Sequence, residues 1–196
     1  MFDTPFRFVN LWNKETEDGR KYYYKFSLPD KTRINVEIDW HKDVDLSVVK
    51  FYRDKDKNSN TRFNALIGNG YASRTILTVI LIVGDFFKKH QSISLAFMAA
   101  ERLTKSGAKE DESKEDTSRF RIYRYALTAV AYKWFSGQES FVLPSKFKTY
   151  SDSSLSTLVF VNPRIKDTET YIDKIKSLSI HYGELETVSF QNNARY

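Results

Sequence analysis

A glycine-containing turn ahead of a long apolar run holds the residue types best suited to chemistry in this chain. It consists of Gly68, Asn69, Gly70, Tyr71, Ala72 and Ser73. Glycines let the backbone approach an anion closely, and the free amides at the start of a following helix point towards that anion. One interpretation is therefore a phosphate-binding loop. The other is an ordinary flexible turn, because a single glycine-rich turn is a weak signal.

Arginines form the second candidate site. Arg74 directly follows the glycine turn, and Arg119, Arg121 and Arg124 are concentrated near the start of a later helical pattern. Guanidinium groups bind phosphates and carboxylates through paired hydrogen bonds. The cluster indicates either a patch for an anion or an acidic partner, or a solvated helix face.

Other chemistries have little support in the sequence. His41, His90 and His181 are far apart and lack metal-binding spacing, so we expect no metal site. The chain has no cysteine, which excludes a disulfide framework and a thiol nucleophile. It contains neither a GxSxG elbow nor a P-loop lysine motif, and no acidic pair is isolated among apolar residues, so a carboxylate dyad is not expected.

Two helices and an intervening strand must position these candidate residues. Apolar residues at helical spacing predict a helix over 73–89, with Ser73 as its N-cap and with Lys88 and Lys89 suited to its C-terminal dipole. The apolar run at 93–98 is typical of a strand buried on both faces. A second main helix is predicted to begin near residue 117 and to end before Gly137.

Strands account for most of the remaining pattern. Residues 32–40 alternate between an apolar and a polar face, which predicts a half-buried antiparallel strand. It follows a turn at 28–31. Further segments are predicted as strands at 6–12, 20–28, 46–53 and 156–161, with a possible short strand at 62–67 and one more in the C-terminal tail. Residues 167–178 are predicted to form a short amphipathic helix.

These elements predict an α+β, α/β-like fold: a mostly antiparallel, partly open mixed sheet with two main helices. A length of 196 residues suits one domain, 1–196, with a core at about 20–135 and a C-terminal extension at 136–196. The net charge of +6 is scattered, so nucleic-acid binding is only a third hypothesis. The N-terminus lacks a signal-peptide pattern and the longest apolar run is too short to cross a bilayer, so we expect a soluble, cytoplasmic protein with no membrane contact.

The order of these parts resembles the core of the GNAT acyl-CoA N-acyltransferases, β-β-β-β-α-β-α-β. The loop of that family runs Arg/Gln-x-x-Gly-x-Gly/Ala. Gly68, Gly70 and Ala72 match it, while Ile67 stands where arginine or glutamine is expected. The resemblance implies acetyl-CoA or CoA as cofactor, with its pyrophosphate held by the amides of residues 68–73. It also implies that Tyr123 is the general acid for the departing CoA thiolate.

A second resemblance is to small uncharacterised proteins of tailed phages and Bacteroidetes. It rests on the combination of Thr78, Val79, Ile82, Val83 and Phe86 with the run Ser118 to Tyr123. The favoured hypothesis is a non-catalytic interaction or assembly module on a GNAT-like scaffold, phage-encoded and acting in a virion or on a host. No cofactor is then expected, and the partner is another protein or a further copy of the chain. The alternative is an acyl-CoA-dependent N-acyltransferase that acts on an unknown amine.

Overall fold

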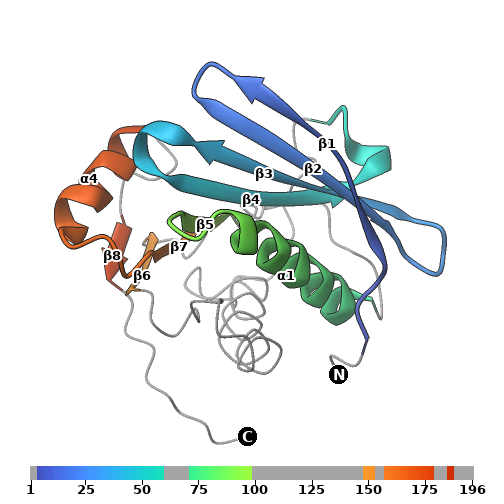
Figure 1. Cartoon of the computed structure of the whole chain (residues 1–196). Helices are drawn as coiled ribbons and strands as arrows, with labels where there is room; N and C mark the ends of the chain where they lie inside the picture. Colours follow the sequence, from blue (N-terminus) through green and yellow to red (C-terminus); the bar gives the residue numbers. More distant parts are fainter. Residues whose placement is uncertain (1–3, 60–70, 99–147, 153–156, 179–184, 188–196) are drawn as a thin grey trace, which may run out of the picture.

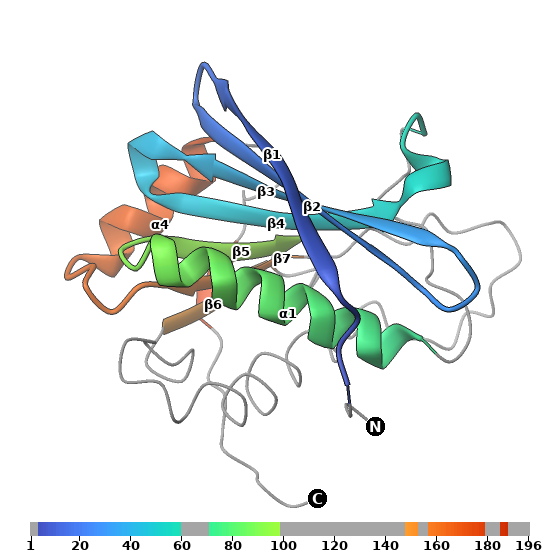
Figure 2. The ribbon, with the colours of Figure 1, turned by 45° about the vertical axis from the view of Figure 1, so that its right-hand side comes forward.

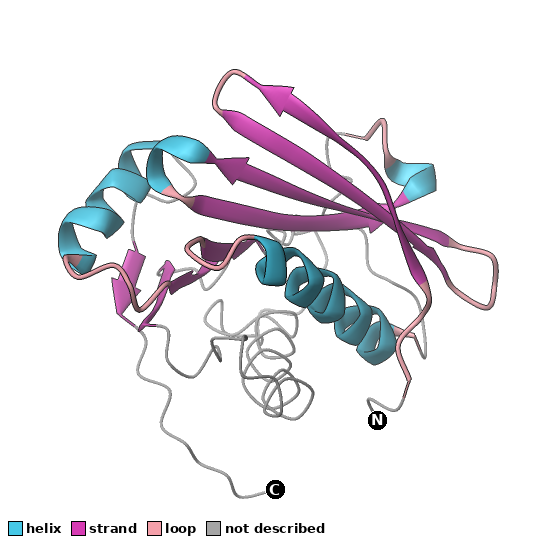
Figure 3. Cartoon of the chain, in the orientation of Figure 1, coloured by secondary structure: helices cyan, strands magenta, loops and turns pink. Residues whose placement is uncertain are grey.

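An eight-stranded mixed sheet, with a helix packed on each face, forms the described part of the chain (Figures 1 and 3). The computed structural model describes residues 4–59, 71–98, 148–152, 157–178 and 185–187. The strand order across the sheet is β1-β2-β3-β4-β5-β7-β6-β8. This arrangement confirms an α+β class with a mixed sheet.

The first half of the sheet is an antiparallel meander of strands β1 (Phe8–Thr16), β2 (Gly19–Ser27), β3 (Arg33–His41) and β4 (Leu46–Arg53). The turn between β2 and β3 is closed by the amide of Lys31, which donates to the carbonyl of Leu28 at 3.0 Å. Lys31 has a φ of 67° there. Short 3₁₀ turns, η1 (Lys42–Val44) and η2 (Asp54–Asp56), follow β3 and β4.

Strand β1 differs from the prediction of a strand at 6–12. It begins later, at Phe8, and continues through residues 13–16, beyond the predicted end. The turn needs only residues 17 and 18, because Gly19 already pairs within β2. Glycine is required at this position, since an added Cβ would lie 1.8 Å from the carbonyl oxygen of Trp40.

Helix α1 (Ala72–Lys89) connects β4 to β5 (Ser94–Met98), and β5 runs parallel to β4. Every other strand pair in the sheet is antiparallel. The helix and the buried strand confirm the predictions for 73–89 and 93–98. Ser73 as N-cap was wrong: Tyr71 holds that position without a side-chain cap, and Ser73 already lies in the first turn.

The C-terminal part of the chain completes the same sheet. Strand β7 (Thr157–Val161) lies between β5 and β6 (Lys148–Asp152), and β8 (Leu185–Thr187) pairs with β6. Helix α4 (Thr168–Leu178) lies between β7 and β8 in the sequence, close to the predicted 167–178. The predicted strand at 62–67 and the helix from residue 117 lie outside the described residues, so a GNAT-like order of all the elements stays a prediction.

Two apolar cores pack on opposite faces of the sheet (Figure 2). On one face, side chains of α1 such as Phe86 pack against β2, β3, β5 and β7. On the other, Tyr171, Ile172 and Ile175 of α4 pack against β4, β5, β6 and β7. Consecutive residues of a central strand enter different cores, as Leu95 and Ala96 do. Among the described helices, none combines the length and apolarity needed to cross a membrane.

The polar face of β3 departs from the prediction of a half-buried strand. Glu37 and Asp39 are only 6% and 5% exposed, although they point away from the α1 core. Strand β3 lies between β2 and β4, so long side chains on both neighbours surround these carboxylates. Burial here follows from the central position of the strand.

Candidate functional site

The start of α1 is where the structure places the described part of the predicted phosphate loop. Tyr71, Ala72 and Ser73 form the N-cap and the first helical residues, while residues 68–70 lie outside the described part. The amide of Thr75 donates to the carbonyl of Tyr71 at 2.9 Å. The preceding amides have no acceptor within the helix, as at the start of any helix, and they give this end a partial positive charge.

The topology places this helix start at a favourable edge of the sheet. Because α1 leads from the end of β4 back to the beginning of the parallel strand β5, its N-terminus lies near the carboxyl ends of both strands (Figure 2). Ligands of open α/β sheets bind at such edges, next to helix N-termini. The position suits an anion chemically.

Arg74, in contrast, is committed to contacts inside the protein. Its Nε donates to the carbonyl oxygen of Thr4 at 2.8 Å, and its guanidinium carbon lies 4.2 Å from the centroid of the Phe6 ring. Phe6 also stacks on Phe26 and meets Tyr71 edge to face. The segment at residues 4–6 therefore crosses the first turns of α1 and holds the arginine side chain. Arg119, Arg121, Arg124 and Tyr123 lie outside the described residues, so their grouping with Arg74 stays a prediction.

Two buried carboxylates form a cluster that the sequence analysis missed. The hydroxyl of Tyr52 donates to Glu37 Oε1 at 2.7 Å. Lys21 and Lys50 donate to Asp39 Oδ2 at 3.3 Å and 3.1 Å. The other oxygen of Asp39, Oδ1, is buried and has no hydrogen-bond partner among the described residues. The sequence does contain a signal for this cluster, because lysines on the adjacent strands face Glu37 and Asp39. That signal can be recognised only when the strand register is known.

This cluster does not form a metal centre. Within the described ranges, no group of three or more histidine or acidic side chains is arranged to hold a metal ion. Each carboxylate has a cationic or hydroxyl partner, and removing that partner would leave a buried carboxylate uncompensated. The cluster acts as an internal polar network on the face of the sheet that α1 does not cover.

Strand β1 carries the most unusual surface of the described chain. Val9, Leu11 and Trp12 are 56%, 47% and 49% exposed, and all of the large apolar side chains found exposed among the described residues are on this strand. The Trp12 ring stacks on Tyr23 of β2, with the centroids 3.8 Å apart. Large apolar groups gathered on a surface mark sites of interaction with other molecules. The alternation at residues 6–12 predicts a strand but gives no signal that its large apolar side chains are exposed.

The backbone of β1 is also available on one side. Among the described residues, the strand is at the edge of the sheet and pairs only with β2, with a register irregularity between Asn10 and Trp12. The outer edge of such a strand presents amide and carbonyl groups that can pair with another strand. Exposed apolar side chains and a free strand edge therefore coincide in β1.

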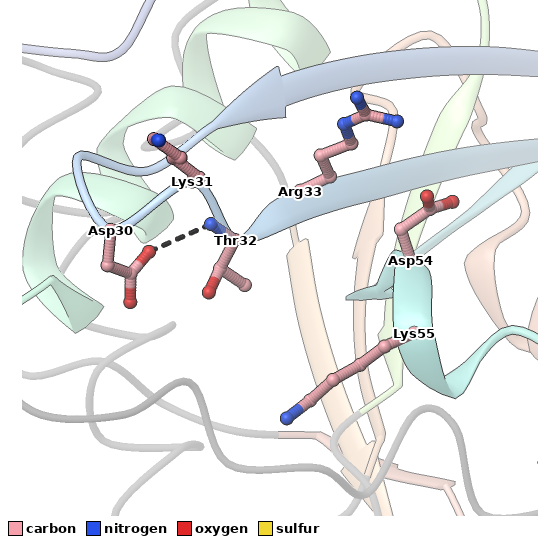
Figure 4. Close-up of a pocket in the computed structure, with 6 residues that line it drawn as sticks. All are labelled: Asp30, Lys31, Thr32, Arg33, Asp54 and Lys55. Atoms are coloured by element: carbon pink, nitrogen blue, oxygen red, sulfur yellow. Dashed lines mark hydrogen bonds between the residues drawn. The ribbon is translucent and has the colours of Figure 1, made fainter.

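A shallow polar hollow lies where the β2–β3 turn meets the end of β4 (Figure 4). It has a volume of about 330 Å³ and is lined by Asp30, Lys31, Thr32, Arg33, Asp54 and Lys55. Figure 4 shows Arg33 and Lys55 directed apart, so their charges do not converge on one point. Asp54 accepts a hydrogen bond from Asn35 Nδ2 at 2.9 Å, which lowers its pKa. We assign no ligand to this hollow.

The two described histidines, His41 and His90, are both partly buried. His90, which follows the last turn of α1, lies 4.5 Å from Phe86, 5.3 Å from Trp40 and 5.4 Å from Tyr22, measured between ring centroids. Burial lowers the pKa of His90, and that of His41 as well. His181 lies outside the described residues.

Comparison with known proteins adds no further assignment: no protein-family model, no curated protein and no solved structure matches this chain. The fold is of the α+β class with a mixed sheet. Its function has to be argued from the surfaces described above.

Proposed function

We propose that this chain is a non-catalytic interaction or assembly module built on a GNAT-like scaffold. The observation that carries the proposal is the concentration of exposed Val9, Leu11 and Trp12 on the edge strand β1. An isolated exposed leucine is ordinary on a protein surface, whereas a cluster on a strand edge marks a surface that can pair with another chain. The interaction surface is accordingly the free edge of β1 together with the Trp12–Tyr23 stack.

Among the described residues, Arg74, Asp39 and Glu37 have internal roles, which supports a binding function over a catalytic one. Arg74 is held by Thr4 and Phe6, and Asp39 is held by two lysines. Glu37 accepts from the buried hydroxyl of Tyr52. These groups stabilise the fold, and each would have to leave its partner before it could act on a substrate.

A phage-encoded role, in a virion or on a host protein, is the setting that we propose for this module. It follows from the resemblance of the patterns around Thr78–Phe86 and Ser118–Tyr123 to small phage and Bacteroidetes proteins. In either setting, β1 is the surface that meets the partner.

Photo-cross-linking from β1 in the native cells tests the proposal. A photoreactive phenylalanine derivative replaces Leu11, which is 47% exposed. The matched control carries it at Lys88, an exposed position near the end of α1. We expect a discrete protein adduct from position 11 and none from position 88. A lack of adduct at position 11, or equal labelling from both positions, would contradict an interaction surface at β1.

A second function, acyl-CoA-dependent N-acyl transfer to an unknown amine, is favoured by the placement of the α1 N-terminus beside the carboxyl ends of β4 and β5. The residues 68–73 would hold the cofactor pyrophosphate and Tyr123 would protonate the CoA thiolate. Calorimetry with acetyl-CoA and with CoA, repeated on Gly70→Trp, separates the two functions. Micromolar binding that the variant loses would support the enzyme, whereas no heat at millimolar ligand would exclude this cofactor.

A further inference from the structure

We propose that the partner of β1 is a second copy of this chain, joined by antiparallel β1–β1 pairing about a two-fold axis. The proposal rests on β1 being the interaction surface. It assigns the occupant of that surface and the part of the strand at which the axis lies.

The two edges of the sheet differ in what they can pair with. Among the described residues, strand β1 has nine residues, whereas the strand at the opposite edge, β8, has three. A β1-to-β8 contact between copies would pair few residues and would repeat head to tail into an open chain. A β1-to-β1 contact uses the same long strand on both copies and closes at a dimer. The outer amide and carbonyl groups of one β1 strand then pair with those of the other.

Apolar side chains on β1 are placed to meet their counterparts across such an axis. Val9, Leu11 and Trp12 lie in one short stretch, and each is about half exposed. Trp12 already stacks on Tyr23, so one face of its ring is covered and its position is fixed by that contact. Pairing about an axis in this stretch would cover the same three side chains on both copies, and aromatic and aliphatic cross-strand pairs stabilise antiparallel sheets.

The charges on β1 restrict the position of the axis. Lys14 and Glu15 are opposite in sign, so the strand has no net charge and one copy does not repel another along it. An axis at Lys14 or at Glu15 would place like charges directly opposite each other, which destabilises a sheet. The axis is therefore on the N-terminal side, between Leu11 and Asn13.

Sedimentation velocity of the purified full chain over a range of concentrations tests the dimer. The double variant Leu11→Lys with Asn13→Lys places added lysines opposite each other in the two copies for an axis at residue 11, 12 or 13. The control Asp173→Lys makes the same change in net charge on α4, where the Asp173 side chain is 76% exposed. We expect concentration-dependent dimers for the wild type and the control, and monomers for the double variant with an unchanged Tm.

Cysteine cross-linking locates the axis, because the chain contains no cysteine of its own. Single cysteines are introduced at Leu11, Trp12 and Asn13, with Glu15→Cys as a neighbour on the strand and Asp173→Cys as a remote control. Residues directly opposite in an antiparallel pair have Cα atoms ~4.5–5.5 Å apart, within the span of a disulfide. We expect one of positions 11–13 to form disulfide dimers roughly ten-fold faster than position 173, because pairing raises the local concentration.

Several outcomes would overturn the proposal that a second copy is the partner of β1. One is a wild-type monomer at millimolar concentration, and another is cross-linking at the same rate from all cysteines. A photo-adduct from position 11 with a different protein would also overturn it, yet would leave β1 as an interaction surface. A monomer that also gives no photo-adduct removes both proposals. Binding of a single-stranded oligonucleotide that Trp12→Ala abolishes and salt weakens would replace the second copy by a nucleic acid.

Discussion

The backbone amide of Phe6 donates a hydrogen bond of 2.9 Å to the side-chain hydroxyl of Thr78, which itself donates to the carbonyl of Arg74 at 2.7 Å. One hydroxyl on α1 therefore joins the N-terminal segment to the helix, although Phe6 and Thr78 are 72 positions apart in the chain. Arg74 strengthens the same contact from the preceding turn through Thr4 and the Phe6 ring. This segment leads directly into the edge strand β1.

Replacing Thr78 by valine should destabilise the protein. Valine keeps the shape of the side chain but leaves the Phe6 amide without its acceptor in a buried place. An unsatisfied buried donor costs ~1–3 kcal/mol, and the free energy of unfolding should fall by that amount. Urea denaturation measures it.

Thr75→Val is the matched control, one turn away on the same helix. The Thr75 hydroxyl is fully buried and has no hydrogen-bond partner among the described residues. Its removal should be neutral or should stabilise the protein by up to ~1 kcal/mol, because valine has no hydroxyl to desolvate. Equal losses in the two variants would mean that the Phe6 hydrogen bond does not account for the effect.

Asn162 joins the end of β7 to the turn between α1 and β5, and its replacement should be costly. The side chain is almost fully buried, and its Nδ2 donates to the carbonyls of Gln91 and Ile93 at 2.9 Å and 3.3 Å. Asn162→Asp would turn an acceptor towards both carbonyls. We expect a loss of ~2–5 kcal/mol at neutral pH in denaturant titrations, because one oxygen of the buried carboxylate would face two carbonyls, while the other keeps the hydrogen bond from the Arg164 amide.

The pH dependence of that variant supplies the check. A carboxyl at position 162 would have a raised pKa in the folded state, so its destabilisation should diminish as the pH falls through that pKa. Asn162→Ala, which adds no charge, should lose less stability at neutral pH and show no such recovery. Similar losses at every pH in both variants would refute the role of the two carbonyls.

Because Lys21 and Lys50 both pair with Asp39, the stability losses caused by replacing each lysine should not be additive. Lys21→Met or Lys50→Met alone leaves one ammonium group on the buried carboxylate, so each should cost less than ~1 kcal/mol. The double variant leaves the carboxylate with neither ammonium group, and its loss should exceed the sum by ~0.5–3 kcal/mol. A double-mutant cycle from chemical denaturation measures this coupling. Lys42→Met, which removes a partner from the exposed Glu15, should change stability little.

Acidification should destabilise the protein through its histidines. Burial, followed by the charges of Arg20 and Lys89, lowers the pKa of His90, and burial is also the main cause that lowers the pKa of His41. The unfolded chain therefore binds protons more readily than the folded one below a pH of about 6.5. The stability is fully present above that value and declines below it, so the Tm should fall between about pH 7.5 and pH 5.5.

Glutamine variants test this dependence. His90→Gln should reduce the slope of Tm against pH over the same interval, and His41→Gln together with His90→Gln should reduce it further. A double variant with the wild-type slope would assign the dependence to other groups.

Several elements could be predicted from the sequence because their pattern is local. The alternation of Ile34, Val36 and Ile38 identified β3, and helical spacing identified α1 and α4 within a few residues of their ends. Both patterns arise from the geometry of the backbone itself, which sets a period of two in strands and 3.6 in helices. For the candidate site, the same spacing placed Tyr71 to Arg74 at a helix start. It could not identify Thr4 and Phe6 as partners of Arg74, because these two residues precede β1 and are about 70 positions away in the sequence.

The sequence by itself therefore determined the kind and approximate position of most elements, through the local periodicity of apolar residues. Only the tertiary structure decided that β5 runs parallel to β4, that β7 lies between β5 and β6, and that β1 is left at an edge. It also decided that Glu37 and Asp39 are buried and that Trp12 is exposed. Strand order and burial depend on contacts between residues distant in sequence, and these follow from how all the elements together cover their apolar faces.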